Sequence, residues 1–141
     1  MALEIYVLFI NYLKLIKMEK LSIDLESNSV KAVFDNYIKD DDFKKFAVQI
    51  LDKVKTSGKK KLLYDTRGLK VMAQSVQGWI NEFWFPEANR LGISHMAFII
   101  PESVFGQMSM EQTNSKKEKI GKINIEYFGN MDKAKEWLNK N

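Results

Sequence analysis

Hydrophobic and polar positions follow two different patterns along this chain. LSIDLE, from residue 21, and VKAVFDNYI, from residue 30, alternate apolar and polar residues, and the SNS between them favours a turn. This alternation predicts an antiparallel hairpin with one buried face. The apolar runs KKLLYD, HMAFII and INIEYF are short and bounded by loops, which is typical of buried strands.

Residues 40–58 have the spacing of an amphipathic helix. One stripe of this segment is apolar, and it consists of Phe43, Phe46, Ala47, Ile50, Leu51 and Val54. The aspartates at 40–42 suit the positively polarised start of a helix, so we interpret them as a helix start rather than as a metal site. Gly58 follows as a stop signal.

A second helix is expected after Ser75, which is well placed to cap it. Its inward stripe consists of Val76, Trp79, Ile80 and Phe83. Pro86 cannot donate a backbone hydrogen bond and disfavours helical geometry at the preceding residue, so the helix should kink or restart there. The kink either returns Phe85 to the core, which we favour, or leaves Phe85 and Trp84 as an exposed aromatic patch for a partner or ligand.

The remaining segments complete an alternating order of strands and helices. Gly92 ends the second helix, PESVFGQMSMEQ begins a third, NMDKAKEWLNK forms a closing helix, and the polar TNSKKEKIGK is predicted to be mobile. This order predicts an α/β fold with a central mixed, mostly parallel sheet of about five strands, an antiparallel opening hairpin and helices packed on the sheet. Ligands of such sheets gather at the carboxyl ends of the strands. Those ends carry Asp65, Thr66, Arg67 and Gly68, then Pro101, Glu102 and Ser103.

The first seventeen residues form a separate apolar segment. Its apolar side chains with helical spacing are Ile5, Leu8, Phe9, Tyr12, Leu13 and Ile16. An amphipathic helix is favoured, although the β-branched and aromatic content leaves a strand open. The polar residues Glu4, Asn11 and Lys14 argue against a signal peptide and a membrane-spanning helix, and two lysines attract an anionic membrane surface only weakly. We expect residues 1–17 to be an extension that packs on its own domain or on a second copy, and residues 18–141 to be a single domain.

Composition narrows the classes of function. The 141 residues include no cysteine, and His95 is the single histidine, which excludes disulfides, thiol nucleophiles and histidine-rich metal sites and fits a cytoplasmic protein. The net charge of +4 comes from lysines, with Arg67 and Arg90 as the only arginines, so we expect no nucleic-acid partner. Asp65, Arg67 and Glu102 form the one titratable cluster at the predicted strand ends, without a phosphate loop, a nucleophile motif or metal-ligand spacing. We therefore expect neither a cofactor nor an enzyme.

The segments KKLLYDTRGL, WINEFWFPEANRLGISHMAFIIPESVFGQMS and IEYFGNMDKAKEWL resemble the SpoIIAA-like, or STAS-type, domains, and within them small bacterial proteins of unassigned function. The order of elements agrees from Leu21 to the end. The resemblance implies a STAS-like fold and a non-catalytic regulatory or protein–protein interaction domain that often self-associates. We therefore expect a protein partner and a homodimer, formed by the surplus apolar surface of the opening segment and of the region of Trp84 and Phe85.

Partner-switching members of this group carry an Asp-Ser-Ser-Gly motif after the central strand, and its first serine is phosphorylated. When LLYD is placed on that strand, AQSV stands at the motif with Gln74 in place of the phosphorylated serine, so the acceptor is missing. DTRG resembles the motif but lies earlier, at the strand end. There Thr66 would accept phosphate and Arg67 would pair with it. The candidate partner or phosphorylation loop comprises Asp65, Thr66, Arg67, Gly68 and Ser75.

The same group is similar to CRAL-TRIO lipid-transfer domains, which implies an apolar, lipid-like ligand as an alternative function. The candidate residues for such a ligand, or for an interface, are Trp79, Phe83, Trp84, Phe85, Phe105, Met108 and Met110. Methionine adapts well to irregular apolar shapes. Because the sequence identifies no polar anchor for a ligand, we favour the simpler interpretation that these side chains fill the core.

Overall fold

A computed structural model describes residues 2–18, 20–34, 39–69, 74–111 and 117–141, with the backbone alone for residues 12–18 and 109–111. The strands are β1 (Leu21–Asp24), β2 (Ser29–Val33), β3 (Lys61–Asp65), β4 (His95–Ile99), β5 (Lys117–Ile120) and β6 (Ile123–Phe128). The helices are α1 (Ala2–Met18), α2 (Asp40–Ser57), α3 (Gln74–Trp79), the π-helical turn η1 (Ile80–Trp84), α4 (Phe85–Arg90), α5 (Glu102–Glu111) and α6 (Met131–Lys140). Among these described helices, none is both long and apolar enough to cross a membrane.

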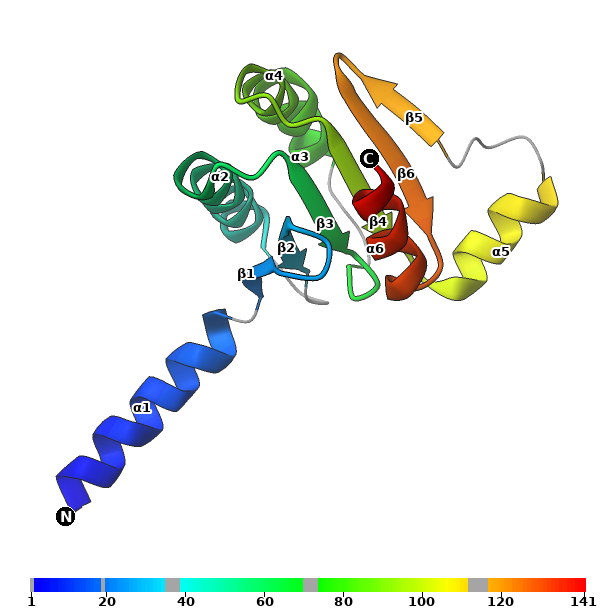
Figure 1. The fold of residues 1–141 in the computed structure, drawn as a ribbon. Helices are drawn as coiled ribbons and strands as arrows, with labels where there is room; N and C mark the ends of the chain where they lie inside the picture. The colour runs from blue at the N-terminus through cyan, green and yellow to red at the C-terminus, as the bar shows by residue number, and fades with distance from the viewer. Residues whose placement is uncertain (1, 19, 35–38, 70–73, 112–116) are drawn as a thin grey trace.

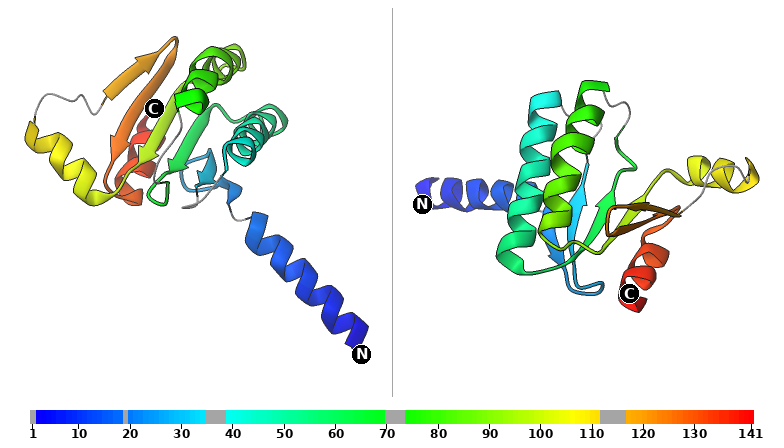
Figure 2. Two further views of the ribbon diagram at one scale, coloured as in Figure 1. Left: turned by 180° about the vertical axis from the view of Figure 1, so that it is seen from behind. Right: turned by 90° about the horizontal axis from the view of Figure 1, so that it is seen from above.

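The six strands form one sheet in the order β1-β2-β3-β4-β6-β5. The central strands β2, β3, β4 and β6 run parallel, and the hairpin partners β1 and β5 close the two edges in antiparallel orientation. Helices α2 and α3–α4 lie on one face of the sheet, and α6 lies on the other, as the view from above in Figure 2 shows. The predicted α/β fold with a mixed, mostly parallel sheet is therefore confirmed.

The two faces of the sheet are filled by alternate residues of the same strands. On β3, Leu62 and Tyr64 point into the larger cluster under α2 and α3–α4, and Leu63 points into the smaller cluster under α6. The α2 stripe expected from the sequence is buried at Phe43, Ala47, Ile50, Leu51 and Val54. Gly58 ends this helix in the left-handed region, with φ of 73°, and its N–H bonds to the carbonyl of Val54.

A π-helical turn replaces the kink expected near Pro86. The N–H of Phe85 bonds to the carbonyl of Ile80, five residues back, so the hydrogen-bonded loop of η1 encloses one more residue than that of an α-helix. This extra residue rotates the following side chains inward, and both Trp84 and Phe85 are buried in the larger cluster. The core alternative for Phe85 is thus confirmed. The proposed interface of Trp84 and Phe85 is corrected, because their side chains are not on the surface.

Three local expectations need correction. The sheet has six strands instead of about five, because the segment KEKI, expected to be mobile, forms the edge strand β5. The opening turn begins earlier than the predicted SNS: residues 25–28 make the turn, with Asn28 at φ of 51°, and Ser29 starts β2. Segment 2–18 is a helix that extends away from the sheet (Figure 1), and its described side chains, on residues 2–11, are mostly exposed, so these residues do not pack on their own domain.

The β1–β2 turn is joined to α6 by a polar cluster. Lys135 Nζ on α6 lies 3.1 Å from Asp24 Oδ1 and 3.2 Å from Glu26 Oε2. Ser27, which is fully buried, donates to the Asp24 carboxylate through its backbone N–H at 2.9 Å and also through its hydroxyl. Burial raises the pKa of Asp24, but the hydrogen bonds of Ser27 and the charge of Lys135 outweigh this effect and hold the pKa below its usual value.

Candidate functional site

An apolar cavity of about 270 Å³ lies between the helices of one face and the carboxyl halves of the parallel strands. Its floor comes from β3, β4 and β6, and its walls come from α2, η1 and the β5–β6 hairpin. The aromatic residues that line it are Phe34, Phe43, Tyr64, Trp84, Phe85, Phe98 and Tyr127. Ligands of open α/β sheets bind at this end of the strands, so the cavity is the candidate binding site.

Three of these aromatic side chains form a row across the sheet. Tyr64 pairs in register with Phe98 on the next parallel strand, and Phe98 pairs with Tyr127 on the strand after that. The ring centroids of Tyr64 and Phe98 are 5.2 Å apart with the rings nearly perpendicular, and those of Phe98 and Tyr127 are 5.5 Å apart. Each of these residues stands next to last in its strand. The row therefore had a signal in the sequence, an aromatic residue one position before each strand end, that the sequence analysis missed.

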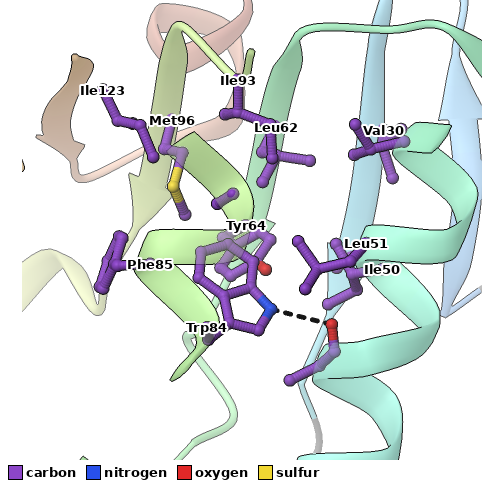
Figure 3. Packing of buried hydrophobic residues seen from close by; sticks show 14 of the residues in the cluster. Val30, Ile50, Leu51, Leu62, Tyr64, Trp84, Phe85, Ile93, Met96 and Ile123 are labelled. Atoms are coloured by element: carbon purple, nitrogen blue, oxygen red, sulfur yellow. Dashed lines mark hydrogen bonds between the residues drawn. The ribbon is translucent and has the colours of Figure 1, made fainter. Parts of the chain in front are cut away.

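Trp84 holds the helical wall of the cavity. Its indole N–H donates a 2.9 Å hydrogen bond to the carbonyl of Ala47 on α2, as the dashed line in Figure 3 shows. The indole stands perpendicular to Phe85, with ring centroids 5.2 Å apart, and its centroid lies 6.1 Å from that of Tyr64. One side chain of η1 thus fixes the separation of two helices above the sheet.

Asn89 on α4 attaches the β5–β6 hairpin, which forms another wall of the cavity. Its amide nitrogen donates to the carbonyls of Phe85 and Ile120, and its amide oxygen accepts a 2.8 Å bond from the backbone N–H of Lys122. Gly121 of the same hairpin has φ of 61°, and a Cβ there would lie 2.6 Å from the Asn89 side chain. Only glycine fits this close approach, which docks the β5–β6 hairpin on α4.

The loop after β3 borders the cavity at Thr66 and Leu69. Asp65 accepts two side-chain hydrogen bonds from Arg67, at 2.9 Å from Nε and 2.8 Å from Nη2, and a third from the Arg67 backbone. Burial raises the pKa of Asp65, but the hydrogen bonds and charge of Arg67 outweigh it and lower the pKa below its usual value. Thr66 donates from both its backbone N–H and its hydroxyl to the carbonyl of Ile99, at 2.9 Å each. Residues 65–69 therefore form a turn that is hydrogen-bonded to the end of β4.

The structure separates the remaining candidate residues. Gly68 of the same loop is half-buried, and Ser75 is exposed within the first turn of α3; neither is among the residues that line the cavity. Phosphorylation of Thr66 or Ser75 stays a prediction. Trp79 and Phe83 stack on each other with centroids 5.3 Å apart, outside the lining, and Phe83 is 46% exposed.

Two of the candidates on α5, Phe105 and Met108, are not among the residues that line the cavity. Phe105 packs beside the backbone of Gly129, where an added Cβ would lie 3.1 Å from the ring, and Met108 is half-buried on the same helix. The side chain of Met110 lies outside the described residues. Of the aromatic and methionine residues proposed for an apolar ligand, the structure brings Trp84 and Phe85 to the cavity, together with Thr66 of the loop.

Glu118 and Tyr127 form the polar rim of the cavity. The Tyr127 hydroxyl donates to Glu118 Oε2 at 2.9 Å, and burial together with this carboxylate raises the pKa of Tyr127 well above its usual value. Glu118 is the one charged side chain among the described lining residues. The geometry combines an apolar, aromatic interior with a weakly acidic rim, an arrangement suited to binding.

Comparison with known proteins identifies the family. The SpoIIAA-like family model matches residues 30–139, which extend from β2 to α6 and include every strand and helix that surrounds the cavity. Neither a curated protein nor a solved structure matches the chain. The family match covers more than half of the sequence, and together with the strand order and the layers described above it confirms the resemblance seen in the sequence. The chain belongs to the SpoIIAA-like family of STAS-type domains.

Proposed function

We propose that the chain is a non-enzymatic binding domain that associates with protein partners, and that its first partner is a second copy of itself, held through α1. The SpoIIAA-like family supports a regulatory or interaction role. The bidentate pairing of Asp65 with Arg67 supports a structural role for the carboxylate that otherwise would be the best candidate for catalysis. The observation that carries the proposal is the apolar surface of α1.

Helix α1 exposes an unusual concentration of large apolar side chains. Those that are half or more exposed are Leu3, Ile5, Tyr6, Val7, Leu8 and Phe9. Five of them are consecutive, so they occupy every side of the helix instead of one stripe. A helix that is apolar all round is normally enclosed by other protein. A second α1 offers an equally apolar surface, and pairing two identical helices about a twofold axis buries the same residues on both copies.

The mass of the full-length protein in solution tests this proposal. Multi-angle light scattering at micromolar concentration should give twice the chain mass for the wild type and the chain mass for the double variant Ile5→Glu, Leu8→Glu, because buried glutamates oppose pairing. Val48→Glu is the matched control, since Val48 is an exposed apolar residue on α2 and its variant should remain dimeric. A monomeric wild type refutes self-association. A monomer whose sedimentation with anionic vesicles is abolished by the glutamate variant would assign α1 to a membrane surface instead.

A second candidate function is the binding of a small apolar ligand in the cavity. The observation that favours it is the open volume of about 270 Å³, which exceeds the roughly 150 Å³ of an engineered apolar cavity that binds benzene. Native mass spectrometry of freshly purified protein tests this function. A retained small molecule supports it, and a bare chain mass at gentle ionisation counts against it.

A further inference from the structure

The hydroxyl group of Tyr64 has no hydrogen-bond partner among the residues that the structure describes. The side chain is only 7% exposed, and burial raises its pKa well above the usual value, so the phenol is neutral at physiological pH. Among the described residues, none forms a hydrogen bond with Tyr64 Oη, whereas every fully enclosed side-chain polar atom has a partner. Tyr64 Oη therefore keeps its small accessible surface in the cavity that Tyr64 lines.

The other polar groups of the cavity contrast with Tyr64. The Thr66 hydroxyl bonds to the carbonyl of Ile99, the Trp84 indole to the carbonyl of Ala47, and the Tyr127 hydroxyl to Glu118. Asn81 also lines the cavity, but its side chain is exposed to solvent. A polar group that is buried without a hydrogen bond destabilises a fold, and proteins retain such groups where a ligand or water completes the bond.

The charges of the cavity restrict what can complete that bond. None of the described lining residues is a lysine or arginine, and Glu118 places a negative charge at the rim. An anionic group such as a fatty-acid carboxylate would meet repulsion at the rim and find no cation among the described lining residues. The aromatic row of Tyr64, Phe98 and Tyr127 offers flat apolar surface for the body of a ligand.

We infer that Tyr64 is the polar anchor of the cavity, which means that Tyr64 Oη hydrogen-bonds to the bound ligand. This ligand is a small, uncharged molecule with an apolar, preferentially aromatic body and one carbonyl or hydroxyl oxygen that makes the hydrogen bond. This inference rests on the apolar-ligand function proposed above and names its ligand class. The volume of the cavity leaves room for a ligand larger than benzene.

Three small molecules of nearly equal shape distinguish hydrogen bonding to Tyr64 from apolar binding in the cavity. Acetophenone has a carbonyl, α-methylstyrene replaces that oxygen by a methylene group, and benzoate replaces the methyl ketone by a charged carboxylate. Titration of the full chain with each of them, followed by ¹H–¹⁵N chemical shifts, gives the three dissociation constants. We expect acetophenone to bind about threefold to tenfold more tightly than α-methylstyrene, as one hydrogen bond predicts, and benzoate to bind most weakly.

The Tyr64→Phe variant tests the anchor itself. It should bind α-methylstyrene as the wild type does and lose the preference for acetophenone, while the control Tyr127→Phe, whose hydroxyl already bonds to Glu118, should keep that preference. In the absence of ligand, Tyr64→Phe should leave the melting temperature unchanged or raise it, because it removes a nearly enclosed hydroxyl that hydrogen-bonds to no described residue. A lowered melting temperature would show that the hydroxyl has a structural partner.

The outcomes distinguish the two levels of the proposal. Equal binding of acetophenone and α-methylstyrene by the wild type overturns the anchor and leaves the apolar cavity standing. Tightest binding of benzoate overturns the uncharged ligand class. If no molecule shifts the resonances of the residues that line the cavity, ligand binding there is itself refuted.

Discussion

Replacement of Trp84 by phenylalanine measures how strongly the helical wall of the cavity is held. Trp84 is 3% exposed, and its indole N–H joins η1 to the carbonyl of Ala47 on α2. Phenylalanine keeps an aromatic ring at the site but removes the donor and part of the buried ring system. The variant thus removes the one hydrogen bond described between these two helices without changing charge.

The expected loss of stability follows from these two changes. The net contribution of one hydrogen bond is about 0.5–1.5 kcal/mol, and the lost ring atoms and the space they leave contribute on the order of 1 kcal/mol. The total loss is therefore about 2 kcal/mol, a considerable part of the roughly 5–15 kcal/mol that stabilises a domain. With a urea m-value of about 2 kcal/mol/M, the midpoint of unfolding should fall by about 1 M.

Urea unfolding followed by far-UV circular dichroism is the appropriate assay, because the substitution itself changes tryptophan fluorescence. Trp79→Phe is the matched control: Trp79 is half-buried, its indole nitrogen bonds to no described residue, and Lys44 Nζ lies 5.8 Å from its ring centroid, a contact that phenylalanine can also make. The control should lose less than about 1 kcal/mol. Equal losses for the two variants would refute the argument that the indole hydrogen bond holds the wall.

Three further predictions concern the backbone, the pH dependence and the hairpin wall. At Gly58 and Gly78 an added Cβ would have no atom within 4 Å, so substitution by alanine measures the effect on the backbone alone. In thermal melts, Gly78→Ala inside α3 should stabilise the protein by about 0.5–1 kcal/mol, and Gly58→Ala, at φ of 73°, should destabilise it by about 1–2 kcal/mol. Changes of the same sign would contradict this reasoning. The pKa of Asp24 in the folded protein lies below its unfolded value of about 4, so its contribution to the free energy of unfolding is complete above that pH and is lost as the pH falls through the folded pKa. Asp24→Asn should therefore reduce the loss of stability that urea unfolding measures between pH 5 and pH 2. An unchanged pH dependence would disprove the role of the ion pair and hydrogen bonds of Asp24. Asn89→Ala should accelerate amide hydrogen exchange in the β5–β6 hairpin with little change in β3, and a uniform acceleration would argue against local docking.

Much of the fold could be predicted because it depends on local periodicity. The stripe of α2, its end at Gly58 and the apolar run of β3 are all recognisable from neighbouring residues, and the structure has them where the sequence places them. The edge strand β5 could not be predicted in this way. KEKI has one apolar residue in four, and it forms a strand because it pairs with β6. Lysines are common on exposed edge strands, where they discourage pairing with other chains.

The candidate site was predicted only in part, because a cavity is a tertiary property. The sequence located Trp84, Phe85 and Thr66, but the register that aligns Tyr64 with Phe98 depends on which strands become neighbours. The anchor was missed for a related reason. Whether a buried hydroxyl has a partner depends on all the residues around it, and the sequence of β3 gives Tyr64 no feature that distinguishes it from a core tyrosine.

The π-helical turn sets the phase of the helix that follows it. If the same residues wound as a regular α-helix, everything after η1 would rotate by about one residue step, or about 100°. Trp84 would leave Ala47, and Asn89 would turn away from the hairpin, so the two walls of the cavity would open together. An insertion or deletion in α3 or α4 would shift the phase in the same way, so sequence variation in these two helices should occur by substitution.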